Sequence, residues 1–323
     1  MILVRSAQGL YWMSRYLARA EHLCRMMALQ MEAMVDRPFR EVHFGWSRIY
    51  GTMERTPPWG DIGELESDEG LLFDSYTLAE DMTFERLHPE SVWSCFAMGR
   101  ENARQMRQCI TGEMWLGLNL PYLRLQKMGI RDIWRTSPET FYNETAGAIS
   151  AFTGAAADTM YRDENWFFMR LGRAIEKSQL TTGLFLTQLR LSRQADESFD
   201  GDWETLLRLY HAFEAYVVRY AVQVEPGQVL DLLATDNHLP SSLSRMLGHV
   251  EEAIDALGPG PDAAASDELR RLAGRVSALV KYEWDGRHNP EPLLNEVYSH
   301  CRDLHDLVSA TYFDYPIQDA PER

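Results

Sequence analysis

LYWMSRYLARAE, residues 10–21, is the stretch that decides the fold of this chain. Its first four residues, Leu10 to Met13, are bulky and apolar, so they point to all sides of a helix. A helix that is apolar all round is a buried helix. Arg15 and Arg19 follow one turn apart, and an unpaired buried charge costs several kcal/mol or more. We therefore expect a packed helix whose two cations either reach water or meet carboxylates.

The same helix continues for roughly seven turns, because apolar residues recur at spacings of three and four. These residues are Leu10, Met13, Leu17, Ala20, Cys24, Met27, Met31 and Met34. A second stripe runs from Val92 to Ile110. Further helical patterns cover about 140–162, 164–193, 203–224, 240–257, 267–284 and 290–313. Strand-like alternation bounded by turns is not convincing anywhere, so the sequence predicts an all-α fold, a multi-helix bundle.

Proline and glycine mark the connections between these helices. Pro57 to Gly60, followed by acidic residues up to Glu69, predict a long surface loop. Gly258 to Pro261 form the most flexible connection, but amphipathic helices flank it on both sides. We therefore interpret residues 1–323 as a single helical domain, with 316–323 as a tail.

A faint internal repeat relates two of the helices. The aligned pairs are Ser14 with Gly172, Arg15 with Arg173, Leu17 with Ile175, Arg19 with Lys177 and Ala20 with Ser178. About six matched positions can also arise by chance between two amphipathic helices, so duplication and coincidence both stay open. A duplication predicts two helical halves, residues 1–163 and 164–315.

The charge of the chain limits its partners. Acidic residues number 48 against 32 basic ones, and the formal net charge of −16 repels nucleic acid and anionic lipid surfaces. No stretch reaches about 18 uninterrupted apolar residues, and the first residues lack the features of a secretion signal. We expect a soluble cytoplasmic protein that binds neither nucleic acid nor membrane.

Known cofactor and metal motifs are missing from the sequence. The four cysteines are far apart and predict core thiols in a reducing cytosol, not a zinc site. No phosphate loop or dinucleotide-binding glycine motif is present, so we predict no cofactor. Glu85 with His88 fits a di-iron motif only weakly, because Pro89 follows directly. Glu296 with His300 could ligate a metal, but an ion-paired helix face is the favoured interpretation.

Three helices carry a row of cations beside an apolar stripe. The rows are Arg15 and Arg19; Arg100, Arg104 and Arg107; and Arg173 and Lys177. One interpretation pairs them with carboxylates such as Glu21, Glu101 and Glu176, where Glu176 is placed to meet Arg173 at i, i+3 spacing. The other has some of the arginines converge on an anionic ligand, a carboxylate or phosphate held bidentately. Both interpretations stay open.

Four stretches together resemble the bacterial alpha-E family, an all-helical domain named for a glutamate-arginine motif. They are LYWMSRYLARAEHLCRMM, ARENARQMRQCITGEMWLGLN, FMRLGRAIEKSQLTT and DNHLPSSLSRML. The resemblance spans roughly residues 1–315. It implies a genomic association with circularly permuted ATP-grasp ligases and transglutaminase-like proteases, hence a system that builds or trims amide-linked peptides. Any ATP and magnesium would then be bound by a partner ligase.

The chain departs from the family pattern in its first motif. Ala18-Arg19 stands where the family has Glu-Arg, and the second motif reads Glu176-Lys177. Arg19, Glu21, Arg173 and Glu176 carry the signature that remains, and Arg100, Glu101, Asn102, Arg104 and Asn119 match the central block. The loss of the first glutamate argues against a strictly catalytic role for that position, so the carboxylate that meets Arg15 and Arg19 must come from elsewhere.

Three functions stay open from the sequence. The first is an accessory subunit that docks an ATP-grasp-type ligase or presents an acidic peptide to it through the arginine rows. The second is an enzyme acting on amide-linked glutamyl or aspartyl peptides, with Glu101 or Glu176 as general acid or base. The third is a homo-oligomeric scaffold. Trp59 and the aromatic run Tyr312 to Pro316 are candidate anchors for a protein partner.

Overall fold

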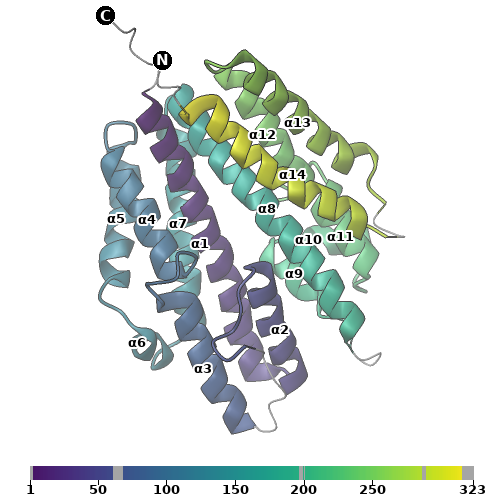
Figure 1. Cartoon of the computed structure of the whole chain (residues 1–323). Coiled ribbons are helices and arrows are strands. Elements are labelled where there is room, and N and C mark those ends of the chain that lie inside the picture. The colour runs from purple at the N-terminus through teal and green to yellow at the C-terminus, as the bar shows by residue number, and fades with distance from the viewer. Residues whose placement is uncertain (1–2, 61–67, 196–198, 200, 286–288, 315–323) are drawn as a thin grey trace, which may run out of the picture.

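A computed structural model of the chain describes residues 3–60, 68–195, 199, 201–285 and 289–314. These residues form fourteen α-helices and one short π-helical turn, and no strand occurs among them (Figure 1). The prediction of an all-α, multi-helix fold is confirmed. No described helix combines the length and the apolar character that crossing a bilayer requires.

The first seven helices are α1 (Val4–Asp36), α2 (Phe39–Thr52), α3 (Asp68–Phe84), α4 (Val92–Gln105), α5 (Gly112–Leu125), α6 (Ile130–Trp134) and α7 (Pro138–Thr159). The others are α8 (Glu164–Gln194), α9 (Trp203–Leu209), α10 (Phe213–Arg219), α11 (Pro226–Thr235), α12 (Leu243–Leu257), α13 (Ala263–Tyr282) and α14 (Glu291–Val308), followed by the π-helical turn η1 (Ser309–Phe313).

Two predicted boundaries were wrong. The helix predicted over 203–224 is two short helices, α9 and α10, because His211 between them takes a left-handed backbone conformation with φ 52°. The loop predicted up to Glu69 ends earlier, since α3 begins at Asp68. The acidic residues Glu64 and Glu66 of that loop lie outside the described residues.

The two longest helices, α1 and α8, lie side by side at the centre and run in the same direction (Figure 1). Tyr11 of α1 lies against Gly172 of α8, and one turn further along Arg15 meets Glu176. The helices approach closely at this crossing: a Cβ on Gly172 would fall 2.7 Å from Ser14 Oγ and closer still to the Tyr11 carbonyl oxygen. Glycine is therefore the residue that permits this contact.

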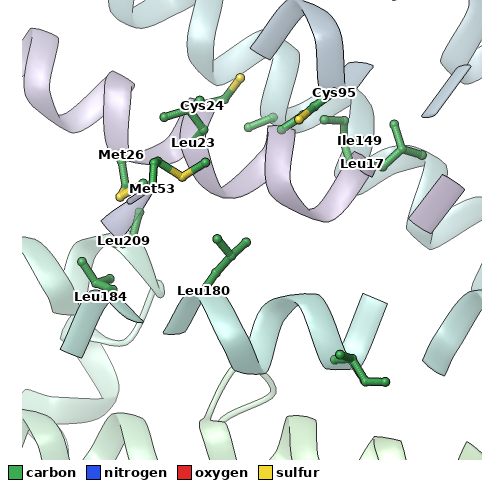
Figure 2. Close-up of a cluster of buried hydrophobic side chains, with 14 of the residues drawn as sticks. Leu17, Leu23, Cys24, Met26, Met53, Cys95, Ile149, Leu180, Leu184 and Leu209 are labelled. Carbon is green, nitrogen blue, oxygen red and sulfur yellow. The ribbon is translucent and has the colours of Figure 1, made fainter. Parts of the chain in front are cut away.

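The remaining helices surround this pair. Helices α4 and α7 pack against α1, whereas α12 and α14 pack against α8. Figure 2 shows the core where these layers meet: Leu17 and Cys24 of α1 lie near Cys95 and Ile149, and Leu180 of α8 lies near Leu184 and Leu209. Cys24, Cys95 and Cys301 are buried, as predicted, and Cys109 is half-buried. All four cysteines are free thiols.

The aromatic residues near the end of the chain are not free anchors. Phe313 is buried in the core, and the Tyr312 hydroxyl donates a hydrogen bond of 2.8 Å to the Gly258 carbonyl oxygen. The prediction of exposed aromatics was therefore wrong at these two positions, because the π-helical turn folds them back onto the bundle. Trp59 is exposed, whereas Tyr315 and Pro316 lie outside the described residues.

Candidate functional site

The cations of the opening stretch find their carboxylate on α8. Arg15 Nε donates to Glu176 Oε2 at 2.6 Å, and Arg19 Nε donates to Glu176 Oε1 at 2.5 Å. Arg19 also pairs with Glu90. Burial alone would raise the pKa of Glu176, but the two guanidinium groups outweigh it and hold the pKa below its ordinary value. Glu176 is thus a buried carboxylate, ionised and clamped from both sides.

Glu21 of α1 is likewise a buried carboxylate surrounded by cations. Arg173 Nη2 donates to Glu21 Oε2 at 2.7 Å, and Lys177 Nζ lies 3.6 Å from the same oxygen. Arg25 Nη2 and Ser150 Oγ each donate to Glu21 Oε1 at 2.9 Å. Burial opposes ionisation of this carboxylate too, but its cationic neighbours hold the pKa of Glu21 far below its ordinary value.

The two helices therefore exchange ion pairs: two cations of each helix meet one carboxylate of the other. The predicted i, i+3 pair between Arg173 and Glu176 was wrong. Both oxygens of Glu176 are taken by α1, and Arg173 turns to Glu21 instead. Glu21 lies one turn beyond Ala18 and meets Arg173 and Lys177, whereas the carboxylate that meets Arg15 and Arg19 comes from Glu176 of α8.

The charge balance differs between the two clusters. The cations Arg15 and Arg19 meet two carboxylates, Glu176 and Glu90, and this cluster is neutral. In the other cluster Arg25, Arg173 and Lys177 share the single carboxylate of Glu21. The formal charges of these three cations and of Glu21 sum to +2. In a chain of net charge −16, this local excess is the feature that an anionic ligand would recognise.

Two adjoining cavities open beside this second cluster. The first has a volume of about 310 Å³ and is lined by Glu21, His22, Arg25, Lys177, Thr181, Leu209, Tyr210, His211, Leu239, Pro240 and Ser241. The second has a volume of about 360 Å³, and Lys177, Pro240 and Ser241 line it as well. Both volumes lie at the lower end of the range for small-molecule sites. The cavities therefore meet at Lys177 and at the loop before α12.

His22 adds a hydrogen-bonding atom to the first cavity. The residue is only 8% exposed, and its Nε2 has no hydrogen-bond partner among the described residues. Burial, with a further contribution from Lys177, lowers the pKa of His22 to about 3. The imidazole is therefore neutral at physiological pH. A buried polar atom without a partner is costly, so a bound ligand or water would satisfy it.

Lys177 is the cation that the two cavities share. Burial, reinforced by Arg173, lowers the pKa of Lys177 to about 8, although Glu21 opposes this shift. Its side chain keeps 26% of its surface exposed, and the ammonium is mostly protonated at neutral pH. Lys177 is therefore a charged donor that can reach a ligand in either cavity.

Comparison with known protein families shows the family to which this chain belongs. A model described as a predicted alpha-helical domain with a conserved ER motif, named Alpha-E, matches residues 2–313. The chain belongs to the Alpha-E family. No curated protein and no solved structure matches it. The resemblance seen in the sequence is confirmed for the family and for the extent of the match.

The central motif of this Alpha-E chain lies away from the cavities. Arg100 donates two hydrogen bonds to Asn119 Oδ1, at 3.0 and 2.8 Å, and stacks on Trp115. Arg104 pairs with Glu101 at 2.6 Å on the surface. The other two predicted residues make local contacts: Asn102 donates to the Met98 carbonyl oxygen, and Arg107 donates to that of Ile110 and stacks on Trp115. Arg100 and Arg107 thus contact α5, whereas Arg104 pairs within α4.

Several residues of the Alpha-E cavities were missed from the sequence, among them His22, Arg25 and Tyr210. His22 and Arg25 lie on α1 and Tyr210 lies on the connection between α9 and α10, so no local spacing brings Tyr210 to the other two. One signal was available: the stretch DNHLPSSLSRML, which carries part of the family resemblance, contains Pro240 and Ser241. These two residues line both cavities.

The residues weighed as metal ligands have other partners. Glu296 pairs with Arg275 at 2.6 Å and lies 3.4 Å from His300. Glu85 and His88 lie just after the end of α3. Within the part of the chain that the structure describes, no three potential ligands among histidine, cysteine and carboxylates come together.

Proposed function

We propose that this Alpha-E chain binds a peptide carboxylate at the cluster of Arg25, Arg173 and Lys177 and works as an accessory subunit of an ATP-grasp-type amide-ligase system. The observation that carries the proposal is the charge excess at this cluster, where three cations share Glu21. A carboxylate ligand would supply the second negative charge. Guanidinium and ammonium groups form charge-assisted hydrogen bonds with carboxylates, and these are stronger than neutral ones.

Two further features support a ligand at this place. The neutral His22 side chain lines the first cavity beside the cations, and its buried Nε2, which lacks a partner, becomes available to a ligand if the ring turns toward the cavity. The cations are also only partly buried, so that water screens them less than on an open surface while a ligand can still reach them. The neutral cluster of Arg15, Arg19, Glu176 and Glu90 includes the ion pairs that hold α1 to α8.

An accessory role is favoured over catalysis by the two candidate carboxylates. Hydrogen bonds from Arg104 and Gln105 lower the pKa of Glu101 to about 2, and the pKa of Glu176 is also lowered. A general acid at neutral pH needs the opposite shift. Both oxygens of Glu176 are already engaged by Arg15 and Arg19. The ligase as partner is proposed from what the family resemblance implies.

The carboxylate site is tested by calorimetric titration of the purified chain with N-acetyl-glutamyl-glutamate, with its triamide, in which all three carboxyl groups are amidated, as the neutral control. Lys177→Gln is expected to weaken binding about tenfold, since one charge-assisted hydrogen bond is worth roughly 1.5–3 kcal/mol. Arg104→Gln removes an exposed cation outside the cavities and should leave binding unchanged. Equal affinity for the triamide, or unchanged binding by the Lys177 variant, would overturn the proposal.

The accessory role needs a separate experiment. Tagged chain purified from its own cells is expected to retain a protein of the ATP-grasp class and to increase that protein's ATP-dependent amide formation. A chain that retains no such ligase and forms or cleaves amide bonds alone would refute the accessory role. The carboxylate site is tested separately, by the titration alone.

A further inference from the structure

The second cavity differs from the first in its chemistry. Its inner wall is formed by the buried apolar side chains of Leu17, Phe152, Met169 and Met246. The hydroxyl of Ser14, which also lines it, already donates to the carbonyl oxygens of its own helix. The inner part of this cavity therefore suits an apolar group. The Ser14 hydroxyl has no hydrogen left to donate to a ligand.

Apart from Ser14 of α1 and Ser241 of the loop before α12, the polar residues of this cavity lie on α7, α8 and α12. Arg170 pairs with Glu252, and Thr153 Oγ1 donates to the Ile149 carbonyl oxygen at 3.0 Å. Burial, together with the nearby arginines, lowers the pKa of His249 to about 4, so that its imidazole is neutral at pH 7. Of the cations that line the cavity, Arg173 and Lys177 therefore remain to meet an anion, because they share a single carboxylate.

Arg173 and Lys177 lie where the two cavities adjoin. Lys177 lines both cavities, and Arg173 stands one turn before it on α8 and lines the apolar one. Side chains one turn apart on a helix are separated by about 5–6 Å at Cβ, which is within the span of one amino-acid residue. A carboxylate held here can thus carry an apolar side chain directly into the second cavity.

We infer that the ligand of the proposed carboxylate site is a peptide in which the carboxylate lies next to a large apolar side chain, and that the cavity of Phe152, Met169 and Met246 binds that side chain. The inference rests on the proposed function. Two methionines in the wall make it adaptable, because their unbranched thioether side chains fill irregular gaps. The cavity therefore accepts aromatic and aliphatic side chains of different shapes but gains little from glycine or alanine.

Such a carboxylate has two sources: the carboxyl terminus of a peptide that ends in an apolar residue, or a glutamyl side chain followed by one. Four probes separate them: N-acetyl-Gly-Phe, N-acetyl-Gly-Gly, N-acetyl-Glu-Phe amide and N-acetyl-Gly-Phe amide. Burying a phenylalanine side chain predicts that at least one Phe acid binds about tenfold or more tightly than the Gly-Gly acid. The neutral amide should bind far more weakly than either.

A pair of variants on one helix tests where the side chain binds. Thr153→Phe fills the apolar cavity, whereas Thr145→Phe changes a half-buried threonine of α7 that makes the same i−4 hydrogen bond and lines neither cavity. Thr153→Phe should reduce the tenfold preference for the Phe acids to about one, with binding of the Gly-Gly acid retained, and Thr145→Phe should keep the preference.

The outcomes separate this inference from the proposed function. Equal binding of the Phe and Gly-Gly acids, or a preference that survives Thr153→Phe, overturns the inference and leaves the carboxylate site intact. If no acid binds, the proposed function fails and the inference fails with it. A Phe preference lost only in the Thr153 variant supports both.

Discussion

Gly172 of α8 lies directly on the backbone of Tyr11 in α1, in a close contact between the two central helices. A side chain at position 172 would meet the Ser14 hydroxyl and the Tyr11 carbonyl oxygen, and the carbonyl cannot move without shifting α1. The ion pairs from α1 to Glu176 begin one turn further along, so this glycine contact sets the separation at which they form.

Gly172→Ala should therefore lower the midpoint of thermal unfolding, because overpacking a tight contact costs about 1–3 kcal/mol. Gly154→Ala on α7 is the matched control, since nothing lies within 4 Å of the added methyl group. That change should stabilise the helix by roughly 0.5–1 kcal/mol. Thermal unfolding followed by circular dichroism measures both, and an unchanged midpoint for Gly172→Ala would refute the close crossing.

The ion pairs between α1 and α8 make a second prediction. Glu176→Gln leaves Arg15 buried beside a neutral group and should destabilise the fold by about 3–5 kcal/mol. Glu101→Gln removes an exposed carboxylate that also pairs with arginine, and should cost at most about 1 kcal/mol. Urea unfolding of the two variants compares them directly. Equal losses would mean that the buried cluster is not what joins the helices.

The same cluster predicts how stability depends on pH. The pKa values of Glu176 and Glu21 are both lowered in the folded state, so the folded state binds fewer protons than the unfolded chain. Their contribution is fully present above the unfolded pKa of about 4.3 and is lost as the pH falls through the folded values. Glu176→Gln should therefore show a smaller loss of stability between about pH 5 and 2 than the unaltered chain.

Local patterns predicted the helices α1, α4, α7, α8, α12, α13 and α14, but not α2, α3, α5, α6 or α11, nor every boundary. The spacing of Leu10, Leu17 and Cys24 determined a long buried helix, and the structure confirms it. The break at His211 could not be predicted, because the sequence around it contains neither glycine nor proline and His211 nevertheless takes a left-handed conformation. Similarly, the beginning of α3 at Asp68 follows an acidic stretch that reads as a loop.

The site was only partly predictable for a related reason. Arg15 and Glu176 are 161 positions apart, so the sequence required a partner for Arg15 without showing which carboxylate it was. The i, i+3 rule favoured Arg173 for Glu176, but packing of α1 on α8 brought two guanidinium groups to that carboxylate instead. Arg173 and Lys177 were predicted from the sequence, whereas the cavity around them is built from several distant segments.

Lys177 predicts a pH dependence of ligand binding. Its pKa of about 8 is well below the ordinary lysine value of about 10.4. Carboxylate binding requires the protonated ammonium, so affinity for N-acetyl-glutamyl-glutamate should fall as the pH rises from 7 to 9. Lys177→Arg keeps its charge throughout this range and should bind with little change. Titrations at pH 7, 8 and 9 test this, and the same decline in both proteins would exclude Lys177 as the titrating group.

A His22 variant tests whether this residue contributes to ligand binding or to the stability of the fold. Its Nε2 is buried without a partner, so replacing it with an apolar side chain removes a desolvated polar atom. His22→Leu should therefore leave the unfolding free energy unchanged or raise it by up to about 1 kcal/mol, while carboxylate binding weakens. His305→Leu is the contrasting variant, because His305 Nδ1 lies 3.0 Å from the Tyr11 hydroxyl and its loss should destabilise the fold by about 1 kcal/mol. Urea unfolding and titration of both variants decide the matter: a large loss of stability in His22→Leu would show that this histidine serves the core and not a ligand.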